Sequence, residues 1–342
     1  MEHRGLGGTG MMVSPLCLGT MMFGEWGNPD HDESVRIIHA ALDAGINFVD
    51  TADVYSRGES EEIVGKALAG SRRDDVILAT KVHGSMGDGP NERGNSRRWI
   101  TREVESSLRR LGTDWIDLYQ VHRYDAHIDH AETLGVLSDL RTAGKIRAFG
   151  CSTFPAEEIV EARWAAERHG LGAYATEQPP YSIFIRRIER DVLPTAQRHG
   201  MGVIPWSPLA GGWLAGKYRR GGEGSPGSAV RSRFSPERFD LEDPGNEVKL
   251  DAVEALEELA ADAGISLIEL ALAFTLAHPA ITAPIIGPRT MEQLESQLGA
   301  ADVVLSDDVL DRIDEIVPPG TNLRDEGGYT PAAIADAKLR RR

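Results

Sequence analysis

The 342-residue sequence predicts a single α/β domain: a (β/α)8 TIM barrel with an N-terminal β-hairpin and two extra helices. Two observations predict this fold. Short apolar runs rich in β-formers alternate with longer segments of helical period, which is typical of βα units around a parallel sheet. The runs number eight, which indicates a closed barrel. We expect residues 1–342 to form one domain, with 320–342 as a terminal tail.

The predicted strands are four to six residues long, and most are followed by a helical segment. The strands span residues 16–19, 46–49, 76–79, 116–121, 146–151, 174–177, 202–205 and 283–286. The helices span residues 32–43, 59–69, 101–111, 130–141, 156–169, 188–198, 265–277 and 291–299. Five of them are followed by a glycine, which favours the left-handed turn that ends a helix. These glycines are Gly45, Gly112, Gly144, Gly170 and Gly200.

Four segments fall outside the repeat. Residues 1–13 predict a hairpin that closes the barrel bottom, and 246–263 and 306–316 predict the two extra helices. Residues 219–245 are rich in Gly, Ser, Pro and charge, which indicates a mobile loop.

A glycine-rich motif in the N-terminal segment imitates a dinucleotide fingerprint. Residues 5–10 match GxGxxG, but a strand-like run stopped by Pro15 follows, and no helix opens there. We therefore interpret the motif as a hairpin turn.

Composition excludes several classes of protein. The 37 basic and 53 acidic residues give a net charge of −16, which disfavours nucleic-acid binding and gives no attraction to a membrane surface. The two cysteines, Cys17 and Cys151, are too few for a disulfide framework or a zinc cluster. No signal peptide or long apolar run is found, so we expect a soluble, cytoplasmic protein.

Polar residues stand at the carboxyl ends of the predicted strands, where barrel enzymes build their sites. We expect them to converge on one mouth. They are Asp50, Lys81, His122, Ser152, Gln178, Trp206 and Ser207.

These residue types suit the protonation of a carbonyl oxygen. A phenol has a pKa of about 10 and is a poor proton donor at neutral pH unless a cation lies nearby. Tyr55 is the candidate donor, Lys81 the cation, and Asp50 the carboxylate that holds Lys81 charged. His122 would orient the substrate carbonyl.

A phosphate site is predicted after the eighth strand. Residues 286–290, Ile-Gly-Pro-Arg-Thr, open the helix 291–299 and offer backbone amides and a guanidinium. Arg289 there favours a 2′-phosphate, and therefore NADP over NAD.

Three motifs carry a resemblance to the aldo-keto reductases, which extends from Gly5 to about Ile316. Residues 45–55, Gly-Ile-Asn-Phe-Val-Asp-Thr-Ala-Asp-Val-Tyr, resemble the family signature, residues 79–81 its lysine motif, and residues 117–122 its histidine motif. The resemblance implies NADP(H), held extended across the barrel mouth. It also implies a catalytic tetrad of Asp50, Tyr55, Lys81 and His122.

The resemblance assigns the cofactor contacts residue by residue. Thr20 and Met21 match the loop near the nicotinamide, Ser152 and Gln178 match the pair that bonds its carboxamide, and Trp206 matches the aromatic residue that stacks on its ring. The remaining contacts are with the phosphates and the adenosine. They are Ser207, Leu209, Gly211 and Lys217 on the pyrophosphate, and Gly287, Arg289, Gln293 and Gln297 on the 2′-phosphate and adenine.

Two positions depart from the common family pattern. Many members have Ser-Asn where this chain has Ser152-Thr153, and many stack a tyrosine where Trp206 stands. Thr153 keeps a hydroxyl but loses the paired donor and acceptor of an amide. Besides Tyr55 and His122, aromatic and methionine side chains are the candidates for the substrate pocket. They are Phe23, Trp26, Met86, Tyr124 and Tyr181.

Three functions are consistent with the sequence. The first is the reduction of a small-molecule aldehyde or ketone, reversible to alcohol oxidation. The second is an NADPH-binding redox sensor or scaffold with little turnover, since residues 122–125 and 206–209 resemble potassium-channel β subunits as well as bacterial aryl-alcohol dehydrogenases and deoxysugar ketoreductases. The third is a metal-dependent barrel hydrolase that would use His83, His122, Asp50 and Glu177, although we expect no metal.

Overall fold

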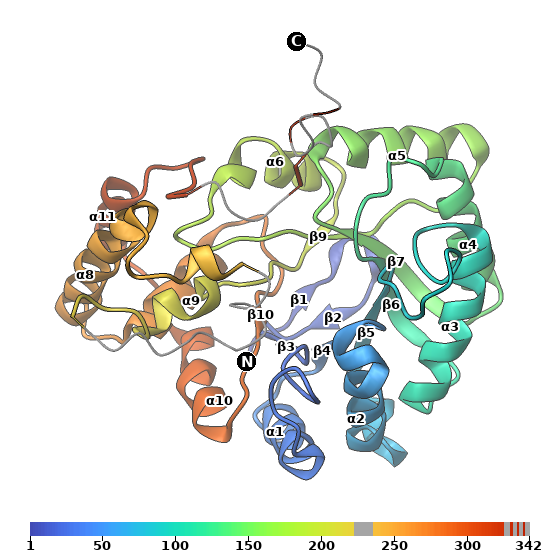
Figure 1. The fold of residues 1–342 in the computed structure, drawn as a ribbon, viewed down its shortest axis with the longest axis horizontal. Coiled ribbons are helices and arrows are strands. Elements are labelled where there is room, and N and C mark those ends of the chain that lie inside the picture. Colours follow the sequence, from blue (N-terminus) through green and yellow to red (C-terminus); the bar gives the residue numbers. More distant parts are fainter. Residues whose placement is uncertain (222–234, 325–328, 331–333, 335–337, 339–342) are drawn as a thin grey trace.

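Eight parallel strands form the centre of the computed structural model, and helices surround them (Figure 1). The structure describes residues 1–221, 235–324, 329–330, 334 and 338. The strand order is β10-β3-β4-β5-β6-β7-β8-β9, so every neighbour except β10 follows in chain order. The strands are β3 (Cys17–Gly19), β4 (Phe48–Asp50), β5 (Ile77–Val82), β6 (Ile116–Val121), β7 (Ile146–Ser152), β8 (Thr176–Gln178), β9 (Gly202–Val203) and β10 (Ile285–Ile286).

Backbone hydrogen bonds join the two ends of this sheet. The N–H of Thr282 donates to the carbonyl of Val203 at 2.8 Å, and the N–H of Ile285 donates to that of Pro205 at 2.8 Å. The segment before β10 therefore lies beside the segment that continues β9. The (β/α)8 prediction is confirmed.

The N-terminal hairpin is also confirmed. Strands β1 (Arg4–Gly5) and β2 (Met12–Val13) pair antiparallel around a short 3-10 turn, η1 (Gly7–Thr9). Gly7 has a φ of +53°, and a Cβ there would lie 2.5 Å from the backbone N of Gly202, the first residue of β9. The glycine-rich motif is thus a turn packed against the bottom of the barrel, which confirms its interpretation as a hairpin turn.

The helices carry an apolar face toward the sheet. They are α1 (His31–Asp43), α2 (Glu59–Ala67), α3 (Arg97–Leu111), α4 (His130–Thr142), α5 (Ala156–His169), α6 (Val192–Arg198), α8 (Glu247–Asp262), α9 (Leu267–Ala277), α10 (Met291–Leu298) and α11 (Asp307–Ile316). The extra helices are α8 and α11, near the predicted bounds. All five helix-ending glycines have positive φ, between 62° and 96°.

Two boundaries differ from the prediction for identifiable reasons. Helix α3 begins at Arg97 and not at residue 101, because the Ser96 side chain accepts a hydrogen bond from the N–H of Trp99 and caps the helix. Strand β5 continues to Val82, so Lys81 lies inside the strand, where it pairs in register with Gln120 of β6. Pairing with β6 therefore extends a strand whose apolar pattern stops at residue 79.

The core has an inner and an outer part. The inner part fills the barrel and includes Leu6 of the hairpin, Phe48 of β4 and Leu118 of β6. The outer part packs between the sheet and the helices. Since Leu6 belongs to the inner core, the hairpin seals one end, and only the end at the strand carboxyl termini is left for a site.

Some expectations concern residues that the structure does not describe. Residues 222–234 of the expected loop 219–245, and most of the tail after residue 324, lie outside the described residues. Among the described helices, none is by itself both long and apolar enough to cross a membrane. Only residues 244–262 and 267–277 taken together pass that test, and they are bent by 90°.

Candidate active site

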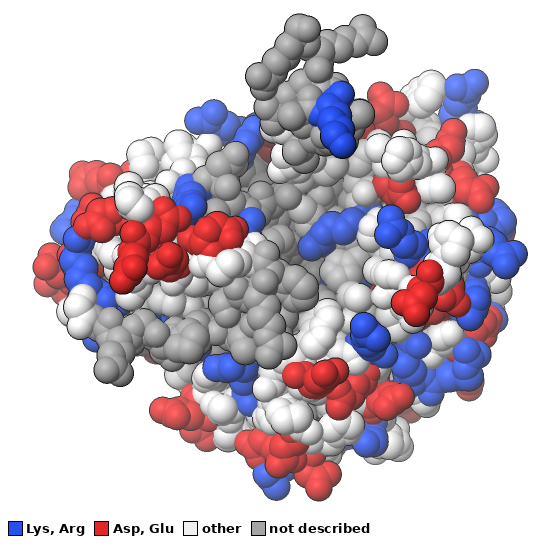
Figure 2. All heavy atoms as spheres, viewed as in Figure 1, with Lys and Arg blue, Asp and Glu red and all other residues white. Residues whose placement is uncertain are grey.

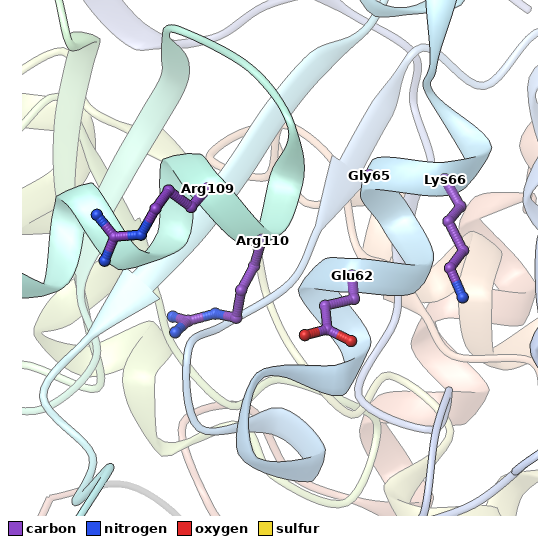
Figure 3. A pocket seen from close by; sticks show the side chains of 5 residues that line it. All are labelled: Glu62, Gly65, Lys66, Arg109 and Arg110. Atoms are coloured by element: carbon purple, nitrogen blue, oxygen red, sulfur yellow. The ribbon is translucent and has the colours of Figure 1, made fainter.

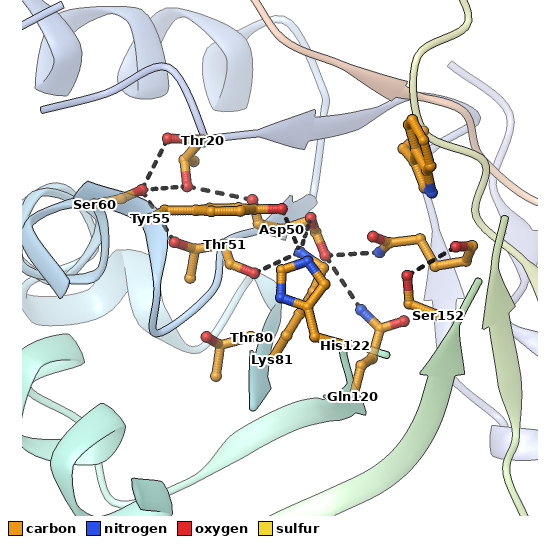
Figure 4. Close-up of polar contacts among 12 residues, drawn as sticks. Thr20, Asp50, Thr51, Tyr55, Ser60, Thr80, Lys81, Gln120, His122 and Ser152 are labelled. Carbon is orange, nitrogen blue, oxygen red and sulfur yellow. Dashed lines mark hydrogen bonds and ion pairs between the residues drawn. The ribbon is translucent and has the colours of Figure 1, made fainter. Parts of the chain in front are cut away.

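Lys81 and Asp50 form a buried ion pair at the mouth of the barrel (Figure 4). The Nζ of Lys81, which has no solvent exposure, lies 2.6 Å from Oδ2 of Asp50. The same ammonium donates to the carbonyl of Thr51 at 2.7 Å and to the hydroxyl of Tyr55 at 3.2 Å. All three N–H donors of Lys81 are thus used, and the third bonds the hydroxyl of Tyr55, the candidate proton donor.

Two amides hold the other oxygen of Asp50. The Nε2 of Gln178, the last residue of β8, donates to Oδ1 at 2.9 Å, and that of Gln120 in β6 donates at 3.2 Å. Sequence reasoning missed Gln120, because it lies inside a strand and carries no charge. Its place two residues before His122 is the signal that it faces the same interior.

Charges around the site set the protonation states of Lys81 and His122. Burial alone favours a neutral amine, but Asp50 and Tyr55 outweigh it and raise the pKa of Lys81 above its ordinary value. Burial, together with the Arg123 and Lys81 cations, holds the pKa of His122 well below its usual range. At neutral pH the site therefore has an ammonium beside the phenol and a neutral imidazole.

His122 faces Tyr55 across the mouth. Their ring centroids are 5.8 Å apart, with the planes at 81°. His122 follows β6 directly, and its N–H donates to the carbonyl of Val82 at 2.9 Å. The four predicted residues of the tetrad therefore lie together, on loops or strand ends that the sheet holds in place.

Tyr55 begins a strained turn. It opens the 3-10 segment η2 (Tyr55–Gly58), in which Ser56 and Arg57 have φ values of +45° and +55°. Non-glycine residues adopt this left-handed region only when their surroundings impose it, and such strain is common at functional sites. Ser56 Oγ accepts from the N–H of Trp26 at 3.1 Å, so the loop after β3 helps to hold the turn.

A buried carboxyl supports the same loop from behind. Asp53 is fully buried, and its Oδ1 accepts from the N–H of Val54 at 2.6 Å. Burial and the neighbouring carboxylates Glu61 and Glu103 raise the pKa of Asp53 well above its ordinary value. Its Oδ2 has no hydrogen-bond partner among the described residues, and the sequence alone offered no signal for this burial.

Ser152, Thr153 and Trp206 stand at the mouth beside Gln178. The hydroxyl of Ser152 donates to the carbonyl of Gln178 at 2.9 Å, and the indole N–H of Trp206 lies 3.4 Å from Oγ1 of Thr153. Thr153 has a φ of +59°.

Thr20 has no solvent exposure, and its Oγ1 forms a hydrogen bond with Oγ of Ser60 at 2.8 Å. Met21 next to it is half-buried.

A loop after β9 contains several residues in the left-handed backbone conformation. Ser207, Ala210 and Gly211 all have positive φ, and Leu209 precedes the short segment η5 (Ala210–Ala215). The N–H groups of Ala210 and Gly212 donate within the loop, to the carbonyls of Ser207 and Leu209 at 2.9 Å each. Lys217 follows the loop.

Lys217 and Arg289 bring two cations together from distant parts of the chain. Burial and the charge of Arg289 lower the pKa of Lys217 from its ordinary value, and neither cation pairs with a described carboxylate. Gln293 accepts from the N–H of Arg289 at 2.9 Å. Oε1 of buried Gln297 has no partner among the described residues. Gly287 is exposed beside them. Two cations without a salt bridge to a described carboxylate fit the phosphates of a nucleotide.

The predicted substrate-pocket residues divide into two groups. Trp26, half-buried, lies 6.2 Å from Tyr55 between ring centroids, and Met86 and Tyr124 are partly buried. Phe23 has no exposure, and Tyr181 packs on Phe274 while its hydroxyl donates to Glu189 at 2.7 Å. The last two belong to the core, and we do not retain them as pocket residues.

No metal centre is apparent in the parts of the chain that the structure describes. There, no group of three or more His, Cys, Asp and Glu side chains is placed to hold an ion. Of the four residues proposed for a hydrolase, Asp50 pairs with Lys81, Glu177 accepts from the N–H of Phe154 at 3.2 Å, and His83 bonds Asn95 at 2.9 Å.

A hollow on the outside of the barrel is not part of this site. It lies between α2 and α3 (Figure 3), and one of its three cations, Arg110, is already paired with Glu61 and Glu103 at 2.6 Å each. Its lining residues are Glu62, Gly65, Lys66, Arg109 and Arg110.

Comparison with known proteins decides the family. The model of the aldo/keto reductase family matches residues 15–318. The chain belongs to the aldo-keto reductase family. The oxidoreductase YrpG of Bacillus subtilis is 39% identical over 98% of this chain and 100% of its own length. A probable voltage-gated potassium channel subunit beta of Arabidopsis thaliana is 35% identical over 93% of this chain and 97% of its own.

A further relative is named for a reductive reaction. The versiconal hemiacetal acetate reductase of Aspergillus parasiticus is 33% identical over 93% of this aldo-keto reductase chain and 98% of its own length. Membership of the family identifies the protein as an oxidoreductase, and aldo-keto reductases generally use NAD(P)H for carbonyl reduction.

Proposed function

We propose that this aldo-keto reductase reduces an aldehyde or ketone with NADPH and that Tyr55 is the proton donor. The observation that carries the proposal is the bridge from Asp50 through Lys81 to the Tyr55 hydroxyl, with contacts of 2.6 and 3.2 Å. An ammonium beside a phenol stabilises the phenolate that forms when the proton leaves. The reaction is reversible in principle.

Each residue of the tetrad has one task. NADPH, when bound, supplies a hydride to the carbonyl carbon. Tyr55 gives its hydroxyl proton to the carbonyl oxygen, so the carbonyl becomes an alcohol and the phenolate takes up a proton again from solvent. Lys81 stabilises that phenolate, and Asp50 holds Lys81. Because its pKa is lowered, His122 is neutral and orients the carbonyl by a hydrogen bond without adding charge.

The residues toward the cofactor are proposed as follows. Ser152, Thr153 and Gln178 hold the carboxamide, and Trp206 packs on the nicotinamide. The loop after β9, with Ser207, Leu209 and Gly211, takes the pyrophosphate together with Lys217. Arg289 takes the 2′-phosphate, which favours NADPH over NADH. Since Thr20 is buried, its part is to fix the loop that Met21 continues.

The decisive experiment is Tyr55→Phe. This variant removes the hydroxyl and keeps the ring, so NADPH binding should persist while carbonyl reduction falls by about 100-fold or more. NADPH affinity is measured by fluorescence titration, and turnover by NADPH oxidation with aromatic aldehydes, sugar ketones and dicarbonyls. Reduction at the wild-type rate with the cofactor bound would refute the assignment. An equal kcat/KM with NADH would refute the role of Arg289.

The sensor or scaffold alternative rests on likeness to channel β subunits alone, and no contact in the site favours it. Negligible steady-state turnover with slow oxidation of bound NADPH would support it. We also propose a cytoplasmic location, since both cysteines are buried and free, as in a reducing compartment.

A further inference from the structure

Arg123 places a guanidinium at the mouth, directly after His122. Its Nη1 donates to the carbonyl of His122 at 2.6 Å and lies 3.3 Å from Oγ1 of Thr153 and 3.5 Å from Oγ of Ser152. These contacts hold Nη1 of the Arg123 guanidinium against the site. Neither Nε nor Nη2 has an acceptor among the described residues.

Arg123 has no direct counter-ion, although the buried carboxyl of Glu177 attracts it at longer range. None of the described carboxylates lies within salt-bridge distance of it, and Asp125, two residues on, uses Oδ1 to accept from the N–H of His127 at 3.0 Å. Arg123 is exposed, but the walls of the mouth remove part of its hydration and lower the pKa of its guanidinium. The neighbouring cation Lys81, in contrast, is neutralised by Asp50.

The backbone of Arg123 is held from behind. Its carbonyl accepts from Nδ2 of Asn95 at 2.9 Å, and the carbonyl of buried Asn95 accepts from the hydroxyl of Thr133 in α4 at 3.0 Å. Oδ1 of Asn95 bonds His83 at 2.9 Å. The base of the Arg123 side chain is therefore positioned, as a binding residue requires, before any ligand arrives.

We propose that Arg123 binds an oxyanion, a carboxylate or phosphate, on the substrate, so that this enzyme acts on aldehydes or ketones that carry a negative charge. The unused edge of the guanidinium, Nε with Nη2, matches the two oxygens of such a group. Acidic and basic side chains both occur among the described residues on the face drawn in Figure 2, and the chain has a net charge of −16, so the attraction comes from the mouth and not from the charge of the whole protein. The inference rests on the proposed reductase function.

The test compares substrates that differ in charge but little in shape. The pairs are 2-, 3- and 4-formylbenzoate, each against its methyl ester, and glyceraldehyde 3-phosphate against glyceraldehyde. In the wild type we expect kcat/KM for at least one anion to exceed that for its neutral partner by about 10- to 100-fold. Preference in the first set identifies a carboxylate, and preference in the second a phosphate.

Arg123→Met should bring the ratio of kcat/KM for the anion to that for its neutral partner down to about one, while Arg123→Lys should keep part of the preference. The matched control is Arg163→Met on the outer helix α5, which makes the same change in net charge and should keep the preference. Calorimetric binding of benzoate to the NADPH complex, measured without turnover, should weaken only in the Arg123 variants.

Two outcomes overturn the proposal. One is a wild type that reduces neutral and anionic partners equally well. The other is an Arg123→Met variant that loses NADPH affinity and slows both partners alike, which would make Arg123 a ligand of the carboxamide through Ser152 and Thr153. Either result leaves the reductase function intact, because that function stands or falls on turnover and on Tyr55→Phe.

Discussion

Two arginines at opposite ends of β6 differ in how their donors are used. Arg73, at the amino end, donates from Nε to Thr113, from Nη1 to the carbonyl of Val76, and from Nη2 to Trp115 and Asp117, at 2.8 to 3.2 Å. Arg123, past the carboxyl end, uses Nη1 alone. Arg73 is 8% exposed and its ion pair is buried, whereas Arg123 faces the mouth.

The difference separates a structural end of the barrel from a chemical one. At the bottom, all three guanidinium nitrogens of Arg73 donate within the protein, so this arginine has no edge left for a ligand. At the mouth, Lys81 turns one donor to Tyr55, and Arg123 keeps two nitrogens free among the described residues. Changes at the mouth should therefore alter chemistry, and changes at the bottom should alter stability.

The largest expected effect is at Lys81. In Lys81→Met the phenol loses the ammonium that stabilises its conjugate base, so kcat should fall by about 10²- to 10⁴-fold while NADPH still binds. Steady-state assays give kcat, and fluorescence titration gives the cofactor affinity. Circular dichroism checks the fold, because Asp50 loses its counter-ion. A kcat within twofold of wild type would remove Lys81 from the mechanism.

Arg73→Met tests the other end. It leaves the carboxylate of Asp117 buried without its cation, which should lower the free energy of unfolding by about 3–5 kcal/mol. The kcat of the folded fraction should not change. Urea denaturation measures the first quantity and assays at low temperature the second. Arg72→Met, which breaks an exposed pair with Asp43, is the control and should cost about 1 kcal/mol or less. A tenfold loss of kcat in Arg73→Met would contradict the division of the barrel into a structural bottom and a chemical mouth.

Glu177 gives a smaller, pH-dependent effect. Burial raises its pKa from 4.5 to about 7, although the N–H of Phe154 and the Cys151 thiol stabilise its charge. The folded state thus binds this proton up to about pH 7, and the unfolded state only up to about pH 4.5. Wild-type stability should therefore fall as pH rises between these values, by on the order of 3 kcal/mol.

Glu177→Gln removes that titration. Its free energy of unfolding, measured by urea denaturation from pH 4.5 to 8.5, should lack this fall with pH. The stability of the variant relative to that of wild type should therefore increase as pH rises. Three titratable groups face Glu177. Arg123 attracts its charged form, whereas Cys151 and Tyr174 stay neutral because burial raises their pKa values. Parallel profiles for the two proteins would show that another group causes the pH dependence.

Much of the fold follows from local patterns in the sequence. The eight apolar runs, the glycine stops and the Pro15 that disqualifies the GxGxxG motif were sufficient for the barrel and its hairpin. Polar residues that follow strands identified the tetrad, because parallel strands end on one rim. The pattern failed at Phe23 and Tyr181, since an aromatic side chain near a strand end fits a pocket wall and a packed core equally well.

The sequence by itself determined which residue types stand at the rim of the barrel, and so the class of chemistry. Only the tertiary structure decided how they are used. Lys81 and Asp50 are 31 positions apart, Gln178 and Asp50 are 128, and these contacts depend on strand register and closure. The free edge of Arg123 and the raised pKa of Asp53 have the same origin. Hydrogen-bond partners and burial are set by neighbours across the barrel, which no local periodicity encodes.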